Sequence, residues 1–379
     1  MKLKIAVLIP RSDMYPALGM DFLNGLKLSV PQLASLGVTP EYIVEGIGNA
    51  ATDDVIKTAE KLILQEGVDL IVSFCSISKL HEFTPLFENY KKPLIHVDLG
   101  GSFLKNESIG DYVLHHTLNL CQSAYAAGVY AAQTFGIKGY SAASFYDGGY
   151  QLTESFVRGF ASEGGEMHGY FICPMDYKSE SFQGLLDAID EIQPDFVFSL
   201  FSYNEGKKVF DIWANSSFNG EIPMVTLPLM TDETINTTDL GVKNVFSVAS
   251  WTFDDERPAM KNFIKTYYDT YESNPNIMGL LGYEVGLTIS QCITPQGSLN
   301  AKLTEAMKGK SIETPRGRLS YNHMNESQVD SFLVRTFQFN QTKYHNHVAE
   351  SLDSSSTHDL YAEFEPLPFT GWQNPYICT

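Results

Sequence analysis

The segment Val68-Asp-Leu-Ile-Val-Ser-Phe74 has a counterpart in Pro194-Asp-Phe-Val-Phe-Ser-Leu200, and this pair decides how the fold is interpreted. A second pair follows in the same order, since Lys92-Pro-Leu-Ile-His-Val-Asp-Leu99 is echoed by Ile222-Pro-Met-Val-Thr-Leu-Pro-Leu229. The offsets are 195 − 69 = 126 for the aspartates and 223 − 93 = 130 for the prolines. Similar segments in one order at nearly one offset predict two similar α/β lobes.

Strand-like and helix-like segments alternate around Val68–Phe74. Strands are predicted at Lys4–Ile9, Glu41–Glu45, Val68–Phe74 and Pro93–Leu99, and helices at Phe22–Leu36, Asp53–Gln65 and Leu80–Asn89. Strands separated by helices of about ten residues or more indicate parallel βαβ units. Gly139–Phe145 then opens the second lobe as Lys4–Ile9 opens the first. The predicted fold class is α/β, with two doubly wound parallel-sheet lobes.

The last third of the chain continues with mixed elements. Helices are predicted at Pro258–Glu272, Tyr283–Gln291 and Lys302–Lys308, a turn into a strand at Thr314–Ser320, and a strand at Phe332–Phe339. The tail from Ser351 has no clear period, but its aromatic residues predict packing on the surface of the protein.

The chain of 379 residues is strongly acidic, with 45 acidic against 26 basic residues and a formal net charge of −19. Such a chain is a poor partner for nucleic acid or an anionic membrane. No apolar run approaches the ~18 residues of a membrane-spanning helix, so no membrane insertion is predicted. Ile5–Pro10 is too short for the core of a signal peptide and is interpreted as a buried strand. We expect a cytoplasmic protein, or one whose signal peptide is not part of this sequence.

The five cysteines are scattered and form no CxxC pair, which argues against a zinc framework or a disulfide scaffold. They are interpreted as buried or idle thiols. Two glycine motifs also need interpretation. Gly46-Ile-Gly-Asn-Ala-Ala51 follows the second strand, whereas a dinucleotide fingerprint belongs after the first. Asp147-Gly-Gly-Tyr150 lacks the basic residue of a phosphate loop. It predicts a turn where the backbone passes close to a ligand and Tyr150 covers that ligand, or else a plain turn.

Other polar residues near strand ends carry two interpretations each. Ser76 and Ser78 suit a carboxylate or other anion, or they cap the helix that begins at Leu80. His96 and Asp98 share one face of a strand, which would suit metal binding or acid–base chemistry. A satisfied buried pair near the cleft is the favoured interpretation, so no metal site is predicted. No GxSxG, HExxH or nucleophile and base at recognised spacing is present in the sequence, so no enzyme activity and no cofactor are predicted.

The order of these segments resembles the type I periplasmic binding proteins, in particular the branched-chain amino acid (leucine/isoleucine/valine) binding group of ABC importers. The likeness covers about Lys4 to Phe339. Its best local matches are Phe74-Cys-Ser-Ile-Ser78, Phe145-Tyr-Asp-Gly-Gly-Tyr150, Tyr283-Glu-Val285 and Thr314-Pro-Arg-Gly-Arg-Leu319. The resemblance implies two lobes joined by three hinge crossovers, with a small ligand between them. The expected lobes are residues 1–119 plus 251–329, and 120–250 plus 330–379, the latter with a C-terminal extension.

The resemblance also implies ligand-binding residues. In the first lobe these are Ser76, with Ser78 near it, and the loop Leu99, Gly100 and Gly101. In the second lobe they are Tyr150 and either Ser202 or Tyr203. Tyr15 and Trp251 follow strands and are added as aromatic residues of the cleft, with ordinary packing as the alternative.

Two positions depart from the pattern. The acidic residue that holds an amine in the amino acid binders corresponds here to about Leu229, so Asp232 or Glu233 would serve only with a reshaped loop. The group's first-lobe disulfide would need a cysteine near Ala50, and Cys75 has none there.

The function expected from the resemblance is that of an extracytoplasmic solute-binding protein for an ABC importer. Its partners would be a small organic ligand and an ABC permease, and the protein would act as a monomer. The ligand would be amino-acid-like, or an aromatic or apolar acid or amide, and leucine itself would bind weakly. A ligand-sensing regulatory module of the same fold is the alternative.

Overall fold

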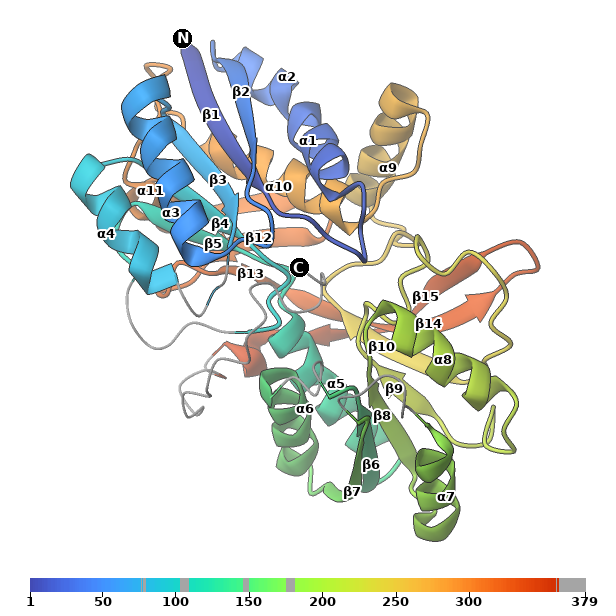
Figure 1. Cartoon of the computed structure of the whole chain (residues 1–379). Helices are drawn as coiled ribbons and strands as arrows, with labels where there is room; N and C mark the ends of the chain where they lie inside the picture. Colours follow the sequence, from blue (N-terminus) through green and yellow to red (C-terminus); the bar gives the residue numbers. More distant parts are fainter. Residues whose placement is uncertain are drawn as a thin grey trace. The chain divides into compact units, whose positions relative to one another are not determined.

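The structure is a computed structural model that describes residues 1–75, 77, 80–102, 109–145, 150–174, 181–358 and 360. The chain divides into two compact units (Figure 1). The first contains Met1–Leu118 and Glu256–Asp330, and the second contains Asn119–Asp255 and the described residues from Ser331 onward. The chain thus passes from one unit to the other after Leu118, after Asp255 and after Asp330. No helix in the described ranges is long and apolar enough to cross a bilayer.

Residues 251–255 lie in the second unit, whereas the sequence assigned them to the first lobe. Hydrogen bonds explain this placement. Thr252 Oγ1 donates to the carbonyl oxygen of Asn346 at 2.9 Å, and Asp254 lies 3.1 Å from the ring of His345. Both partners belong to the second unit.

The first unit is built on a five-stranded sheet in the order β2-β1-β3-β4-β5, in which all neighbours are parallel. Its strands are β1 (Lys2–Ile9), β2 (Thr39–Gly46), β3 (Leu70–Phe74), β4 (Leu94–Val97) and β5 (Val113–His116). Its helices are α1 (Leu18–Leu28), α2 (Val30–Ser35), α3 (Thr52–Lys61), η1 (Leu62–Glu66), α4 (Leu80–Tyr90), α9 (Pro258–Tyr271), α10 (Ile277–Gln291) and α11 (Leu303–Met307). Helices α3 and α4 cover one face of the sheet, and α1 and α10 cover the other (Figure 1). This arrangement explains why β3 is buried throughout and is apolar except for Ser73.

The predicted helix Phe22–Leu36 is wrong as a single element, because α1 ends at Leu28 and α2 begins at Val30. Ser29 Oγ donates to the carbonyl oxygen of Leu26 at 2.7 Å, and Pro31 lies in the first turn of α2. A proline is tolerated in a first turn but interrupts a helix interior, so the break follows from the sequence.

A small antiparallel sheet completes the first unit, with strands β11 (Ser311–Thr314), β12 (Gly317–Tyr321) and β13 (Ser327–Val329). A fully buried ion pair ties it to α10. Arg316 Nε lies 3.0 Å from both carboxylate oxygens of Glu284, and Arg316 Nη2 lies 2.6 Å from Oε2. Nη2 also donates to the carbonyl oxygen of Thr117 at 3.1 Å, and His116 Nε2 lies 3.2 Å from Glu284.

The second unit has a seven-stranded sheet in the order β15-β14-β10-β9-β8-β6-β7. Its strands are β6 (Lys138–Ala143), β7 (Glu166–Ile172), β8 (Phe196–Leu200), β9 (Met224–Thr226), β10 (Val245–Ala249), β14 (Ser331–Phe339) and β15 (Tyr344–Asp353). Its helices are α5 (Leu120–Thr134), α6 (Tyr150–Ser162), α7 (Gln183–Ile192), α8 (Tyr203–Ala214) and the short η4 (Ser355–Thr357). Strands β6 to β10 are parallel, and β14 and β15 add an antiparallel hairpin at one edge.

The internal repeat predicted from the sequence is confirmed. The first strand pair begins at residues 70 and 196, an offset of 196 − 70 = 126, and the second at 94 and 224, an offset of 224 − 94 = 130. In both units the first strand lies between the second and the third, which is the doubly wound order of strands 2-1-3-4-5. Loops that follow the carboxyl ends of such strands are the usual place for a ligand.

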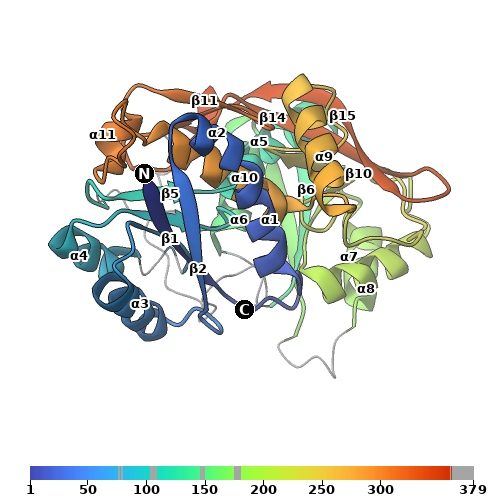
Figure 2. The same cartoon turned by 90° about the horizontal axis from the view of Figure 1, so that it is seen from above.

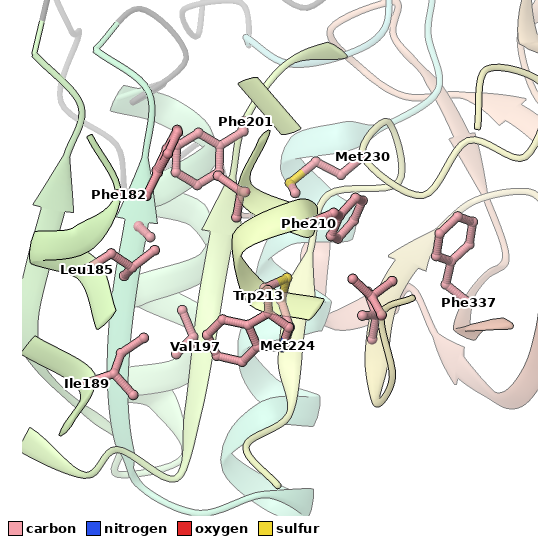
Figure 3. Packing of buried hydrophobic residues seen from close by; sticks show 14 of the residues in the cluster. Phe182, Leu185, Ile189, Val197, Phe201, Phe210, Trp213, Met224, Met230 and Phe337 are labelled. Atoms are coloured by element: carbon pink, nitrogen blue, oxygen red, sulfur yellow. The ribbon is translucent and has the colours of Figure 1, made fainter. Parts of the chain in front are cut away.

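The core of the second unit lies between its sheet and helices α7 and α8 (Figure 3). Phe182, Phe201, Phe210 and Trp213 fill it together with aliphatic side chains of β8, β9 and α7. Each of these aromatic side chains is at most 3% exposed. Burial of side chains this large is the main stabilising contribution to such a unit.

In each unit two helices approach so closely that glycine is required at the crossing. Helix α1 lies along α10 in the first unit (Figure 2), and a Cβ on Gly25 would collide with the carbonyl oxygen of Gly279. Helix α5 lies along α6 in the second unit, and a Cβ on Gly128 would collide with the carbonyl oxygen of Phe156.

Candidate functional site

The loops after β1, β3 and β4 carry the predicted residues of the first unit. Tyr15 follows β1 and is 4% exposed, and its backbone N–H donates to Ser12 Oγ at 2.9 Å. Leu99, Gly100 and Gly101 follow β4 and are buried. Ser76 and Ser78 follow β3, but both lie outside the described residues. Because the strands are parallel, Tyr15 and the loop Leu99–Gly101 lie at the same end of the sheet.

The carboxylate of Asp98 organises the loop after β4. Its Oδ1 accepts a hydrogen bond from the backbone N–H of Gly100 at 2.7 Å and lies 3.0 Å from His115 Nε2. Gly100 has a φ of 76°, a left-handed conformation that glycine adopts without strain. The amide of Gly100 is therefore used inside the loop, so it does not serve as the donor for a ligand carboxylate that the resemblance implied.

His96 and Asp98 each have a hydrogen-bond partner, but the partners are different residues. His96 Nε2 lies 2.7 Å from the carbonyl oxygen of Cys75, whereas Asp98 contacts His115 on the neighbouring strand. Burial lowers the pKa of His96 to about 4, with His115 as a second cause, so this ring is neutral. Burial alone would raise the pKa of Asp98, but the attraction of His115 holds it below its ordinary value. Burial alone would lower the pKa of His115, but Asp98 raises it.

The predicted residues of the second unit also follow strands that are parallel to one another. Tyr150 begins α6 after β6, and Tyr203 begins α8 after β8; the side chains of both lie outside what the structure describes. Ser202 is the residue before α8, and its hydroxyl makes no capping hydrogen bond to the helix. The residues Asp147, Gly148 and Gly149 of the glycine turn are outside the described residues.

The loop after β9 contains the position where the related amino acid binders carry an acid. Leu229 and Met230 are each 4% exposed, so this position is apolar and buried. Asp232 is also buried, and its Oδ1 accepts from the backbone N–H and the hydroxyl of Thr234 at 2.8 and 2.7 Å. Asp232 is therefore committed to the turn of its own loop.

Glu233 differs from Asp232, since one of its oxygens is unpaired. Its Oε2 accepts from Asn346 Nδ2 on β15, whereas its Oε1 is buried and has no hydrogen-bond partner within the described part of the chain. Burial, followed by the neighbouring charge of Asp232, raises the pKa of Glu233 to about 7. This carboxyl is thus partly neutral at physiological pH.

Sequence reasoning placed Trp251 in the site but missed its partner, Arg335. The guanidinium of Arg335 lies over the Trp251 ring at 5.2 Å from the ring centre, and Nη1 donates to the Trp251 carbonyl oxygen at 3.1 Å. Its Nη2 also donates to Thr231 Oγ1 and to Ser247 Oγ. Both Arg335 and Trp251 are at most 2% exposed. An arginine inside the apolar strand Phe332–Phe339 was the available signal, because a buried cation requires partners.

A cavity of about 260 Å³ lies in the first unit. Its lining includes Leu114 of β5, Lys308 after α11, and His323 and Asn325 of the turn between β12 and β13. None of the candidate residues lines it, so it is not assigned to the candidate site.

Solved structures with the same fold are numerous. An ABC transporter substrate-binding protein from Sphaerobacter thermophilus is 20% identical, with a TM-score of 0.81 over 93% of this chain and 98% of that chain. A solute binding protein of an ABC transporter from Rhodopseudomonas palustris, in complex with 3,4-dihydroxybenzoic acid, is 20% identical, with a TM-score of 0.74 and the same coverage. A branched-chain amino acid transporter substrate binding protein from Streptococcus pneumoniae, in complex with isoleucine, is 16% identical, with a TM-score of 0.70 over 92% of this chain and 99% of that chain. The comparison with curated proteins gave no match.

The chain has two α/β units of one strand order, and the residues predicted for the site follow strands of both units. A sequence model of the family described as periplasmic binding protein matches residues 2–338. The chain therefore belongs to the periplasmic binding protein family. Membership implies a small-molecule ligand and a location outside the cytoplasm.

Proposed function

We propose that this protein delivers a small organic solute to an ABC permease, and that it acts as an extracytoplasmic monomer. The observation that supports this most is the doubled strand order, with candidate ligand residues after equivalent strands of both units. A solute that contacts loops of both units would favour the state in which it reaches both, and that state would be recognised by the permease. No chemical step is part of this role.

The acid end of the solute is assigned to the first unit. Asp98 occupies the amide of Gly100, which leaves the Gly101 amide and the hydroxyls of Ser76 and Ser78 as the candidate donors. Backbone N–H groups and hydroxyls before a helix are suited to a carboxylate. The proposal therefore takes a monocarboxylate or a primary amide as the acid-side group.

The other end of the solute is proposed to be neutral and apolar or aromatic. The position after β9 is occupied by Leu229 and Met230, and Asp232 is committed to its own turn. Burying an ammonium group without a partner would cost several kcal/mol. Several proteins of the same fold are described in complex with benzoate or hydroxybenzoates, which supports an aromatic acid as the first class of solute to test.

An α-amino acid is the second candidate, and Glu233 is the observation that favours it. An orphaned, buried carboxyl oxygen whose group has a pKa of about 7 would become fully ionised beside an ammonium. In that case binding near pH 7 would release a proton from Glu233. A neutral-ended solute would release none.

A thermal-shift screen of the full chain tests the proposal. It should contain benzoate, 4-hydroxybenzoate, 3-phenylpropanoate, benzamide, leucine, phenylalanine, a polyamine and a sugar. A solute present at 100-fold its Kd should stabilise the protein by about 2.7 kcal/mol. We expect aromatic acids or amides to give the largest shifts. Stabilisation by the sugar or the polyamine alone would contradict the proposed solute class.

A further inference from the structure

Three potential metal ligands meet at the carboxyl end of β4 and β5 in the first unit. His96 of β4 and His115 of β5 are register partners in the parallel sheet, and Asp98 follows β4 directly. One ligand atom from each of His96, Asp98 and His115 lies within 4.8 Å of the others. Both imidazole side chains are 0% exposed, whereas the Asp98 side chain is 14% exposed.

The hydrogen bonds of the two histidines leave one nitrogen of each without a partner. A carbonyl oxygen only accepts, so the 2.7 Å contact with Cys75 requires a hydrogen on His96 Nε2. A carboxylate likewise only accepts, so the 3.0 Å contact with Asp98 requires a hydrogen on His115 Nε2. In both rings Nδ1 is buried and has no hydrogen-bond partner among the residues that the structure describes.

This pattern is the one that a metal-bound histidine shows. Such a ring donates its other N–H to a backbone carbonyl or a carboxylate, which fixes the ring and its tautomer. His96 does so to the carbonyl oxygen of Cys75. His115 Nε2 and Asp98 Oδ1 lie 3.0 Å apart, which is close to the separation of two ligands of one ion, and a bound cation would replace the hydrogen between them. A purely structural network explains the two Nε2 contacts, but it leaves two buried ring nitrogens unsatisfied, and each such atom is costly. A cation bound at His96 Nδ1 would remove the cost of that atom.

The donor set indicates which cation would bind. Two imidazoles and one carboxylate match zinc sites that keep a fourth position open, and they match other borderline divalent transition metals. Ca²⁺ and Mg²⁺ prefer oxygen ligands and are disfavoured here. Ligands at about 2.0–2.1 Å from a tetrahedral ion lie about 3.4 Å apart, so atoms up to 4.8 Å apart must close by at most about 1.4 Å.

We infer that His96, Asp98 and His115 form a binding site for one divalent transition-metal ion of the Zn²⁺ class. The site does not depend on the identity of the transported solute, so its test requires none. It lies directly before the loop Leu99–Gly101, which Asp98 also holds through the Gly100 amide.

The test uses the full chain after treatment with a chelator. Titration with Zn²⁺ in a calorimeter and with Co²⁺ in a spectrophotometer should each give one equivalent bound, and Co²⁺ should give the strong visible absorption of a four-coordinate site. The variants His96→Gln, His115→Gln and Asp98→Asn should weaken binding by at least about 100-fold, because loss of a ligand exceeds the loss of an outer partner. Asp98→Asn keeps an oxygen that can accept from Gly100, so it separates metal binding from support of the loop.

The matched control is the double variant His345→Gln, His347→Gln. These rings stack at 5.8 Å on β15 and are the obvious place for adventitious binding. The control should bind Zn²⁺ and Co²⁺ as the unmodified chain does. The inference is overturned if the unmodified chain binds no equivalent, or if the control variant abolishes binding. It is also overturned if Asp98→Asn, shown to be folded by circular dichroism and melting temperature, binds as tightly as the unmodified chain.

Discussion

Substitution Glu284→Gln should sharply destabilise the first unit at neutral pH. It leaves the Arg316 guanidinium fully buried without the carboxylate that contacts it at 3.0, 3.0 and 2.6 Å. Removing one partner of a buried ion pair typically costs about 3–5 kcal/mol, because an uncompensated charge remains. The loss should be measured as the free energy of unfolding in urea at pH 7.

The acid dependence gives an independent estimate of the same interaction. Burial alone would raise the pKa of Glu284, but Arg316 outweighs it and lowers the pKa to about 2 from an ordinary value of 4.5. A pKa lowered this far corresponds to roughly 3 kcal/mol of stability. Because the folded pKa is depressed, this stability is present above about pH 4.5 and is lost as the pH falls towards 2. Glu284→Gln should lack this part of the acid dependence.

Two further variants make the result decisive. Glu313→Gln removes an exposed partner of Arg318, where the side chains are 77% and 60% exposed, and should change stability by at most about 1 kcal/mol. The double variant Glu284→Gln, Arg316→Met should recover much of the loss, because no unpaired charge remains. A Glu284→Gln protein that is as stable as the Glu313→Gln control would refute the reasoning.

Two other predictions concern the site and the packing of helices. Tyr150→Ala should weaken binding of a verified solute by about 1–3 kcal/mol in calorimetry. The control Tyr170→Ala, at an exposed residue, should leave the affinity unchanged. Equal affinities of the two variants would mean that Tyr150 begins a helix and does not contact the solute. Gly25→Ala should destabilise the protein by about 1–3 kcal/mol in thermal unfolding, because the added Cβ would collide with the Gly279 backbone. The control is Gly46→Ala, whose added Cβ would have no atom of another residue within 4 Å. Equal melting temperatures for the two glycine variants would contradict the close approach of α1 and α10.

The two similar α/β units were predictable because they rest on local patterns in the sequence. The apolar runs of β3 and β8 and their offset of 126 residues mark two copies of one α/β pattern. The break between α1 and α2 was missed because the apolar spacing continues across Ser29 and Pro31, although a proline at that point is a stop signal.

The partners of polar side chains were less predictable than the elements that carry them. Period-2 reasoning placed His96 and Asp98 on one face correctly, but the partner of Asp98 comes from β5, which pairs with β4 only in the folded sheet. The contacts of Arg335 were missed for the same reason, because its contacts with Trp251 and Ser247 join segments more than 80 residues apart in the sequence. Such contacts depend on tertiary packing, which no local pattern encodes.

The central claim, a solute with a carboxylate end and a neutral end, is tested most directly by a matched pair of ligands. Phenylalanine and 3-phenylpropanoate differ only in the α-ammonium group, so calorimetry of both reports on that group alone. We expect 3-phenylpropanoate to bind at least about 100-fold more tightly, since an unpaired buried ammonium costs several kcal/mol. Submicromolar binding of phenylalanine or leucine, with release of a proton near pH 7, would contradict the claim and identify Glu233 as the partner of the amine.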